Sequence, residues 1–214
     1  MKVKWFGQAA FLFVSETGLS IIADPYDPAY IGYGDIADAA DVVTISHEHR
    51  DHNYVEGVGG KPQVLRGPGL QEAKGIQFKG IATFHDKSQG GERGSNTVFC
   101  FSLDGVRVCH LGDLGHLLSD EQIRDIGEVD LLLVPVGGLA TINAAEASEL
   151  IAKMRPPVAV PMHFRTEKAG LRFAEVDDFL SDKVNIRRLD SSEFEIRKED
   201  LPTPTQIVVL EHAR

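Results

Sequence analysis

Cysteine is scarce in this sequence, because two cysteines in 214 residues cannot build a disulfide framework. Long apolar runs are missing as well, since no segment reaches the length needed to span a bilayer. The first residues, Met1 to Gly7, include no apolar stretch of the kind that forms a signal peptide. We therefore expect a protein of the cytoplasm that has no membrane partner.

Positive charge is also in short supply, because 22 Lys and Arg stand against 32 Asp and Glu, for a formal net charge of -10. Phosphate backbones are bound by clustered Lys and Arg, so nucleic acid is not the expected partner. An anionic small molecule remains compatible with this charge, because bound metal cations can reverse the local sign of a site.

The two cysteines have a defined place in the chain. Asp104-Gly105 predicts a two-residue hairpin turn, and pairing outward from this turn sets Cys100 opposite Cys109. A cross-strand disulfide is geometrically conceivable, but two reduced, half-buried thiols are favoured in a reducing cytosol. Because both cysteines lie inside expected strands, they are poor candidates for a catalytic nucleophile.

The order of expected elements predicts an α/β sandwich in one domain, residues 1–214, because the chain has no repeat, low-complexity segment or linker. Capping patterns at Ser119–Gln122 and Asn143–Glu146 predict two helices, the second over Ala144–Met154, and Glu175–Leu180 is expected to be helical too. Composition alone does not choose among topologies. Strands are expected at Lys2–Phe6, Phe11–Val14, Leu19–Ala23, Asp41–Ser46, Ile76–Phe84, Asn96–Leu103, Val106–Leu111, Asp130–Val136, Val158–Met162, Asn185–Leu189 and Gln206–Leu210.

The most informative segment is His47-Glu48-His49-Arg50-Asp51-His52, which follows an apolar, β-branched run. If the backbone stays extended, the spacing of two puts His47 and His49 on one side. If the chain then turns, Asp51 and His52 face a second ion beside the first. Imidazole nitrogen and carboxylate oxygen are ligands that zinc prefers. A solvated polar loop is the alternative, and it is disfavoured because three of the eight histidines fall within these six residues.

The segment is similar to the His-x-His-x-Asp-His motif of the metallo-β-lactamase superfamily. This resemblance implies an αβ/βα four-layer sandwich with two divalent metal ions at one edge, zinc first, with manganese or iron as alternatives. Each later ligand follows the end of an expected strand, which a chance match would not require. The resemblance implies His47, His49 and His85 as ligands of the first metal, Asp51, His52 and His163 as ligands of the second, and Asp113 as a bridge between the two.

Further segments resemble the small, single-domain branch of the superfamily, which includes the L-ascorbate-6-phosphate lactonase and many metal-dependent hydrolases. They are Trp5 to Phe11, Ile22 to Pro25, Gly90 to Asn96 and Pro161 to Phe164. One position departs from the pattern, because relatives often carry His where this chain has Gln8. Any role of that position in substrate binding is therefore in doubt.

The resemblance implies a hydrolase that uses a metal-bound hydroxide to cleave an ester, lactone or phosphoester of a small molecule. A bound cation lowers the pKa of its water to about 7, so no serine nucleophile is needed. The Gly-x-Ser-x-Gly elbow is indeed absent. The expected catalytic residues are Asp51, Asp113 and His116. His116 could protonate the leaving group, with a solvent-facing loop histidine as the alternative.

Several other residues have weaker assignments. Asp24 is expected to orient a ligand histidine or the motif loop, with an ordinary Asp-Pro turn as the alternative. Arg165 and Lys168 could attract an anionic substrate, but simple solvation is favoured for them and for Arg93. His110 is expected to be a strand residue near the site rather than a ligand. The loop of residues 88–95 is either a flexible flap or a turn.

Other functions remain open at this stage. An RNA or nucleotide phosphodiesterase would need binding arms for which this length and acidity leave little room. Redox chemistry at iron and a non-catalytic metal-binding module are the further alternatives. Stoichiometric iron would favour redox chemistry, and absence of metal would favour a non-catalytic module. A homo-oligomer is compatible with the sequence.

Overall fold

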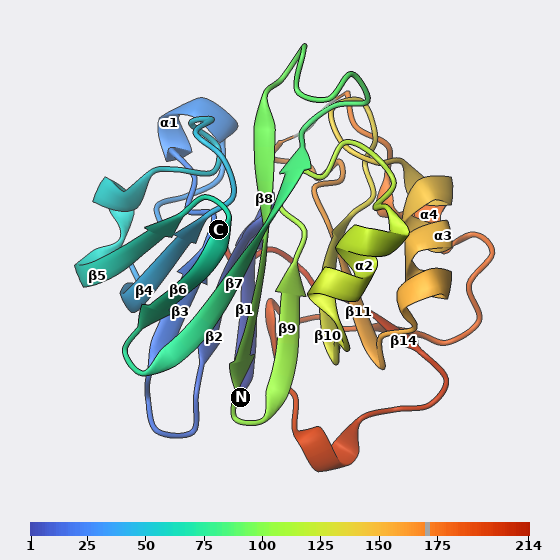
Figure 1. Cartoon of the computed structure of the whole chain (residues 1–214). Coiled ribbons are helices and arrows are strands. Elements are labelled where there is room, and N and C mark those ends of the chain that lie inside the picture. The colour runs from blue at the N-terminus through green and yellow to red at the C-terminus, as the bar shows by residue number, and fades with distance from the viewer. Residues whose placement is uncertain (170–171) are drawn as a thin grey trace.

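The computed structural model describes residues 1–169 and 172–214, which form two β-sheets with helices around them (Figure 1). The first sheet has six strands in the order β13-β1-β2-β3-β4-β5. Strands β1, β2 and β3 pair antiparallel, whereas β3, β4 and β5 pair parallel. The strands are β1 (Lys2–Gly7), β2 (Ala10–Val14), β3 (Ser20–Ala23), β4 (Ala39–Ile45), β5 (Gly59–Arg66) and β13 (Glu193–Glu195).

The second sheet has eight strands in the order β12-β14-β11-β10-β9-β8-β7-β6. The neighbouring strands β6, β7, β8 and β9 pair antiparallel. The neighbours β9, β10, β11, β14 and β12 pair parallel, in that order across the sheet. The strands are β6 (Gly69–Ala73), β7 (Ile76–Phe84), β8 (Ser95–Leu103), β9 (Val106–His110), β10 (Leu131–Pro135), β11 (Val158–Met162), β12 (Ile186–Arg188) and β14 (Gln206–Val209).

Helices α2 (Asp120–Ile126), α3 (Ala144–Met154) and α4 (Val176–Leu180) lie on the opposite side of the molecule from α1 (Pro28–Ile31) (Figure 1). Both expected capping boxes are present, one at Ser119 with Gln122 and one at Asn143 with Glu146. Short 3₁₀ turns cover Val55–Gly57 and Lys198–Asp200. Among residues 1–169 and 172–214, no helix is both long and apolar enough to cross a membrane. Cytoplasmic location stays a prediction.

The six-stranded sheet is apolar on both faces. Ile21 belongs to the main core cluster, which includes buried residues of both sheets, whereas its neighbour Ile22 belongs to a second cluster. Successive strand residues point to opposite faces, so both faces of this sheet are covered. The second cluster is closed by Tyr26, Tyr33 and Ile36 from the segment around α1. The outer layer on this side is therefore built from one short helix and loops.

Strand ends bring the functional segments to one edge. Strands β3 and β4 run parallel and end before Asp24 and Ser46, while β9, β10 and β11 run parallel in the other sheet. Carboxyl ends of parallel strands meet at the same edge of a sheet, which is where ligand sites of α/β proteins form. The loop between β7 and β8 rises at the top of the view in Figure 1.

The β8–β9 hairpin confirms the predicted cysteine pairing register. Asp104 and Gly105 have φ values of 50° and 75°, which are the left-handed conformations that this tight turn requires. Cys100 lies opposite Cys109, and both thiols are free. Burial raises the pKa of the Cys109 thiol, so this side chain is an inert part of the core.

Candidate metal centre

Seven predicted ligands, which follow the ends of four strands (β4, β7, β9 and β11), converge between the two sheets. His47, His49 and His85 form one group whose ligand atoms lie within 4.8 Å of one another. The second group, which meets the same limit, consists of Asp51, His52, Asp113 and His163. Five of the seven side chains are buried, while His49 is exposed and Asp51 is partly exposed. The structure therefore gathers the full set that the sequence predicted.

The carboxylate of Asp113 is the centre of this cluster. Its Oδ2 atom lies 3.2 Å from the Nε2 atoms of His52, His85 and His163, and 3.9 Å from Nε2 of His47. Two ligands that each lie about 2.1 Å from one ion at a tetrahedral angle are about 3.2–3.4 Å apart. One oxygen thus has imidazole nitrogens of both groups at the spacing expected of metal ligands.

A buried carboxylate fixes the ring orientation of two histidines. Asp24 Oδ2 accepts hydrogen bonds from Ser46 Oγ at 2.6 Å and from His52 Nδ1 at 2.9 Å. Because a carboxylate can only accept, the proton of a neutral His52 resides on Nδ1, and the Nε2 lone pair points toward Asp113. Asp24 also accepts the Ser46 backbone N–H at 2.8 Å. Asp24 thus contacts a predicted ligand histidine and the start of the motif loop, as its predicted orienting role requires.

The same network reaches the first group through Ser46. Its hydroxyl proton is donated to Asp24, so Ser46 Oγ accepts from Nδ1 of His47 at 2.9 Å. The Nε2 lone pair of His47 then faces His49 Nδ1, 3.1 Å away. Hydrogen bonds from the outer nitrogen of a ligand histidine set its tautomer in metal sites. Ser46 was not identified from the sequence, since a lone serine before a histidine motif carries no distinctive signal.

Unpartnered buried atoms show that these residues fit metal ions. Among residues 1–169 and 172–214, His52 Nε2 and Asp113 Oδ1 are buried with no hydrogen-bond partner, as are the Nδ1 atoms of His85 and His163. Leaving a buried polar group unsatisfied costs about 1–3 kcal/mol, and more for a charged group. Cations between the nitrogen and oxygen donors would remove the cost at His52 and Asp113. The donor set of imidazole and carboxylate is also the one that zinc and related divalent ions take.

The protonation states agree with this fit at most positions. Burial, together with the neighbouring His52, lowers the pKa of His47 to about 3. Burial also lowers the pKa of His49. At Asp113, burial alone would raise the pKa, but His163 and His52 outweigh it and hold the pKa well below its usual range. Neutral imidazoles and an ionised carboxylate are the forms that bind metals.

His52 shows the opposite shift, and its cause is instructive. Burial by itself lowers the pKa of His52, but the carboxylates of Asp113 and Asp51 outweigh burial and raise it well above the usual value. Burial alone would raise the pKa of Asp51, which His52 holds below its usual range. The pair of carboxylates therefore draws positive charge to His52 Nε2. Two divalent cations would supply that charge and more than balance Asp24, Asp51 and Asp113.

Glycines on both sides of Asp113 allow its close approach to the other ligands. A Cβ atom at Gly115 would lie 2.3 Å from backbone atoms of His85 and Asp86. At Gly112, where φ is +56°, a Cβ atom would lie 2.5 Å from Asn96 and Ser46. Asn96 Oδ1 accepts the backbone N–H of Asp113 at 3.0 Å. Only glycine on each side lets the Asp113 segment reach this position.

The structure argues against the predicted catalytic role of His116. Its Nε2 accepts the backbone N–H of Phe84 at 3.2 Å, and its Nδ1 donates to the carbonyl of Leu117 at 2.9 Å. Both ring nitrogens are thus engaged with backbone, so neither is available to protonate a leaving group. His110 also bonds backbone, because Nε2 donates to the Ala9 carbonyl at 2.8 Å, as expected of a strand residue beside the site.

The mouth of the centre is a cavity of about 510 Å³ whose wall includes His49, Asp51, His85, Asp113 and His163. Arg165 and Lys168, predicted to attract anions, do not line it, and Arg165 is ion-paired with Glu175. The remaining wall instead carries two arginines, one glutamate and four largely apolar side chains. It comprises Tyr30, Glu48, Arg50, Arg93, Leu139, Ala140 and Phe173.

The rim of this cavity exposes apolar surface. Tyr30 and Leu139 are 59% and 58% exposed, which is unusual for large apolar side chains. Phe173 packs on the ring of His163 with 4.5 Å between centroids. Arg50 lies over the Tyr30 ring at 5.3 Å and pairs with Asp27 at 2.5 Å. Sequence reasoning missed these rim residues, because they come from loops with no periodic pattern.

A two-sheet α/β fold with a histidine- and aspartate-rich cluster at the shared sheet edge defines the metallo-β-lactamase class. Residues 2–163 match the family model described as "Beta-lactamase superfamily domain", and the chain belongs to this superfamily.

Individual relatives agree with this assignment. A UPF0173 protein of Pyrococcus abyssi is 33% identical over 79% of this chain and 86% of its own length. A UPF0173 metal-dependent hydrolase of Methanospirillum hungatei is 28% identical over 92% of this chain and 100% of its own. A solved structure from Thermotoga maritima, assigned as a Zn-dependent hydrolase of the superfamily, matches with a TM-score of 0.82 and 39% identity, over 98% of both chains.

Proposed function

We propose that the protein is a metal-dependent hydrolase that uses two divalent ions to cleave an ester, lactone or phosphoester of a small molecule. The observation that carries this proposal is the convergence of four imidazole nitrogens on Asp113 Oδ2, at 3.2–3.9 Å. The similarity to proteins described as metal-dependent and Zn-dependent hydrolases supports it. Zinc is the proposed ion, with manganese or iron as alternatives.

Two groups of donors support two ions. His47, His49 and His85 would hold one ion, while Asp51, His52 and His163 would hold the other, with Asp113 shared between them. When bound, such ions supply Lewis acidity, which lowers the pKa of a water to about 7 and polarises the group that is attacked.

The chain's own residues would orient the reactants. Asp51 lines the cavity and is held ionised, so its carboxylate can accept a hydrogen bond from the attacking water. Gln8 Nε2 donates to Asp51 Oδ2 at 3.1 Å, which fixes the direction of that carboxylate. Asp113 is held from behind by Asn96 through its backbone N–H. Asp51 and Asp113 are thus the proposed catalytic carboxylates.

The substrate is proposed to be a small molecule rather than nucleic acid. The cavity of about 510 Å³ is in the range of small-molecule sites, which are usually about 300–1,000 Å³. A net charge of -10 would repel a phosphate backbone over the rest of the surface. The apolar rim at Tyr30 and Leu139 offers contact area for the non-reacting part of a substrate.

Metal analysis combined with turnover tests this proposal. Two zinc or manganese ions per chain are expected, together with hydrolysis in a panel of lactones, phosphodiesters and thioesters. His49→Ala and Asp113→Ala should lower the metal content and abolish the activity, whereas the control His212→Ala, outside the centre, should change neither. Retained turnover in both ligand variants would overturn the mechanism. Stoichiometric iron would favour redox chemistry, and absence of metal would favour a binding module.

A further inference from the structure

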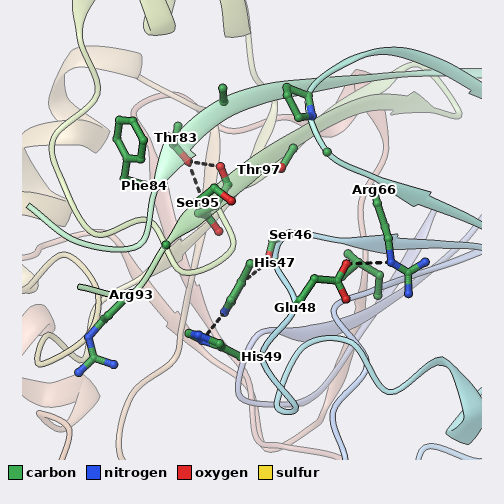
Figure 2. A pocket seen from close by; sticks show the side chains of 16 residues that line it. Ser46, His47, Glu48, His49, Arg66, Thr83, Phe84, Arg93, Ser95 and Thr97 are labelled. Carbon is green, nitrogen blue, oxygen red and sulfur yellow. Dashed lines mark hydrogen bonds and ion pairs between the residues drawn. The ribbon is translucent and has the colours of Figure 1, made fainter. Parts of the chain in front are cut away.

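A second cavity of about 520 Å³ adjoins the metal centre (Figure 2). It lies along the ends of β4, β7 and β8, and its wall includes Thr83, Ser95 and Thr97. His47 and His49 contribute the wall nearest the centre. Glu48, His49 and Arg93 line both this cavity and the one at the mouth of the centre. The two cavities therefore meet at these three shared residues.

The two charged side chains at this junction, Glu48 and Arg93, differ in whether their charge is paired. Glu48 is ion-paired with Arg66 at 2.9 Å, and Figure 2 shows this pair on the side opposite Arg93, with His47 and His49 between them. Arg93 makes no ion pair with any residue in the described part of the chain. Arg50, at the mouth, is already paired with Asp27. Of the arginines that line the two cavities, Arg93 is therefore the one without a carboxylate partner among residues 1–169 and 172–214.

The loop that carries Arg93 is held by a buried carboxylate. Asp86 follows the ligand His85, and its Oδ2 accepts the backbone N–H groups of Glu92 at 3.0 Å and Arg93 at 2.7 Å. Its Oδ1 accepts the N–H groups of Ser88 and Gly90, each at 2.8 Å. The loop is therefore a braced turn rather than a flap. This bracing fixes the Arg93 backbone relative to the metal ligand next to Asp86.

We propose that Arg93 is a specificity-determining residue that binds an anionic group of the substrate, a carboxylate or a phosphate. This inference rests on the proposed hydrolase function and narrows its substrate class to anionic esters and lactones. The charged group would lie at the junction of the two cavities, a few bonds from the reacting carbonyl over the metal centre. Guanidinium groups bind carboxylate and phosphate through two parallel hydrogen bonds, which makes arginine suited to this task.

Matched esters test the inference through turnover. The zinc-loaded protein would be assayed with 4-nitrophenyl hydrogen succinate and with 4-nitrophenyl butyrate, which replaces the carboxylate by a methyl group. We expect kcat/KM for the succinate ester to exceed that for the butyrate ester by about tenfold or more, mainly through KM. Arg93→Ala should remove this preference, and Arg93→Lys should keep part of it because charge remains but the fork is lost.

Two further variants separate a local effect from a general one. Ser95→Trp would fill the second cavity beside Arg93 and should also reduce the preference for the anionic ester. Ser102→Trp, an exposed position on the same strand β8, is the matched control. Arg124→Ala on exposed helix α2 removes the same charge away from both cavities. Both controls should behave as the unaltered protein.

Binding measurements keep this test independent of turnover. Calorimetry would compare N-methylsuccinamate, its phosphonate analogue N-methyl-3-phosphonopropionamide, and neutral N-methylbutyramide, none of which is an ester. Tighter binding of either anion, lost in Arg93→Ala at unchanged zinc content, supports the inference and tells carboxylate from phosphate. If this holds while no ester is cleaved, the hydrolase proposal fails and the anion site stands. Equal binding of all three, or a preference that survives Arg93→Ala, overturns the inference.

Discussion

Replacement of Asp24 by Asn is the sharpest test of how the metal centre is organised. The change keeps the shape of the side chain but turns the acceptor Oδ2 into an NH₂ donor. That NH₂ would face Ser46 Oγ and His52 Nδ1, which now donate to Asp24 at 2.6 and 2.9 Å. To accept a hydrogen bond from the new amide, His52 must place its own proton on Nε2. The nitrogen that faces Asp113 would then have no lone pair for a metal ion.

The size of the effect follows from the role of these contacts. Loss of a hydrogen bond to the outer nitrogen of a ligand histidine typically weakens metal binding by about 10–100-fold, or roughly 1.4–2.7 kcal/mol. We expect the second ion to be weakened by at least this factor, since the wrong tautomer opposes binding directly. Competition with a chromophoric zinc chelator would measure the two affinities. Nitrogen NMR of the His52 ring in the zinc-loaded protein, where a bound ion keeps the ring neutral, would report which nitrogen carries the proton.

A matched control is available in the same molecule. Asp41 accepts from the backbone N–H and the hydroxyl of Ser20, at 3.0 and 3.1 Å, in an arrangement similar to that of Asp24 with Ser46 but remote from any histidine ligand. Asp41→Asn should therefore leave zinc affinity unchanged. Two tightly bound ions in Asp24→Asn, with the His52 proton still on Nδ1, would refute the tautomer argument.

Two further predictions concern the segments that surround the ligands. Asp86→Asn should lower the protection factors of the backbone amides in the following loop, and acidification of the unaltered protein should do the same. The reason is that backbone N–H groups outweigh burial and hold the pKa of Asp86 below its ordinary value of 3.8. Its stabilisation is thus present above that value and is lost as the pH falls through the folded-state pKa. Gly115→Ala places a Cβ atom 2.3 Å from backbone of His85 and should lower the free energy of unfolding by about 1–3 kcal/mol. Thermal unfolding of the metal-free protein would measure this change. Gly34→Ala is the control, and equal melting temperatures of the two variants would contradict the prediction.

Most of the fold followed from local patterns in the sequence. Expected strands Ile76–Phe84 and Val158–Met162, and the helix Ala144–Met154, have the bounds found in the structure. The strands that were missed, β5, β6 and β13, are edge strands of the two sheets. β5 contains two glycines and a proline, and β6 has only Leu70 and Ala73 as apolar side chains, three residues apart, so neither shows the apolar alternation of a strand. Their pairing depends on partners distant in sequence, which local patterns do not reveal.

The site shows a similar division. Ligand types and their order were readable, because a dense His/Asp motif and strand-end positions are local features. The contacts of His116 were not readable, since its two backbone partners are set by tertiary packing around Phe84. Asp86 and Ser46 were missed for the same reason, as an isolated Asp or Ser gives no sign of what it will bond. The residues that brace a site are thus harder to predict than the residues that line it.

Three residues at the centre, Gln8, Asp24 and His163, are not glycine yet have φ values of 51°, 47° and 52°. Such left-handed backbone costs each of them about 1–3 kcal/mol unless the surroundings compensate. Removing this conformational free energy by mutation would stabilise the fold, but it resides at the residues that shape the centre. Glycine there would relax the chain but delete the side chain that the site uses. Stabilising mutations that preserve the site are therefore better placed in loops and sheet edges remote from it.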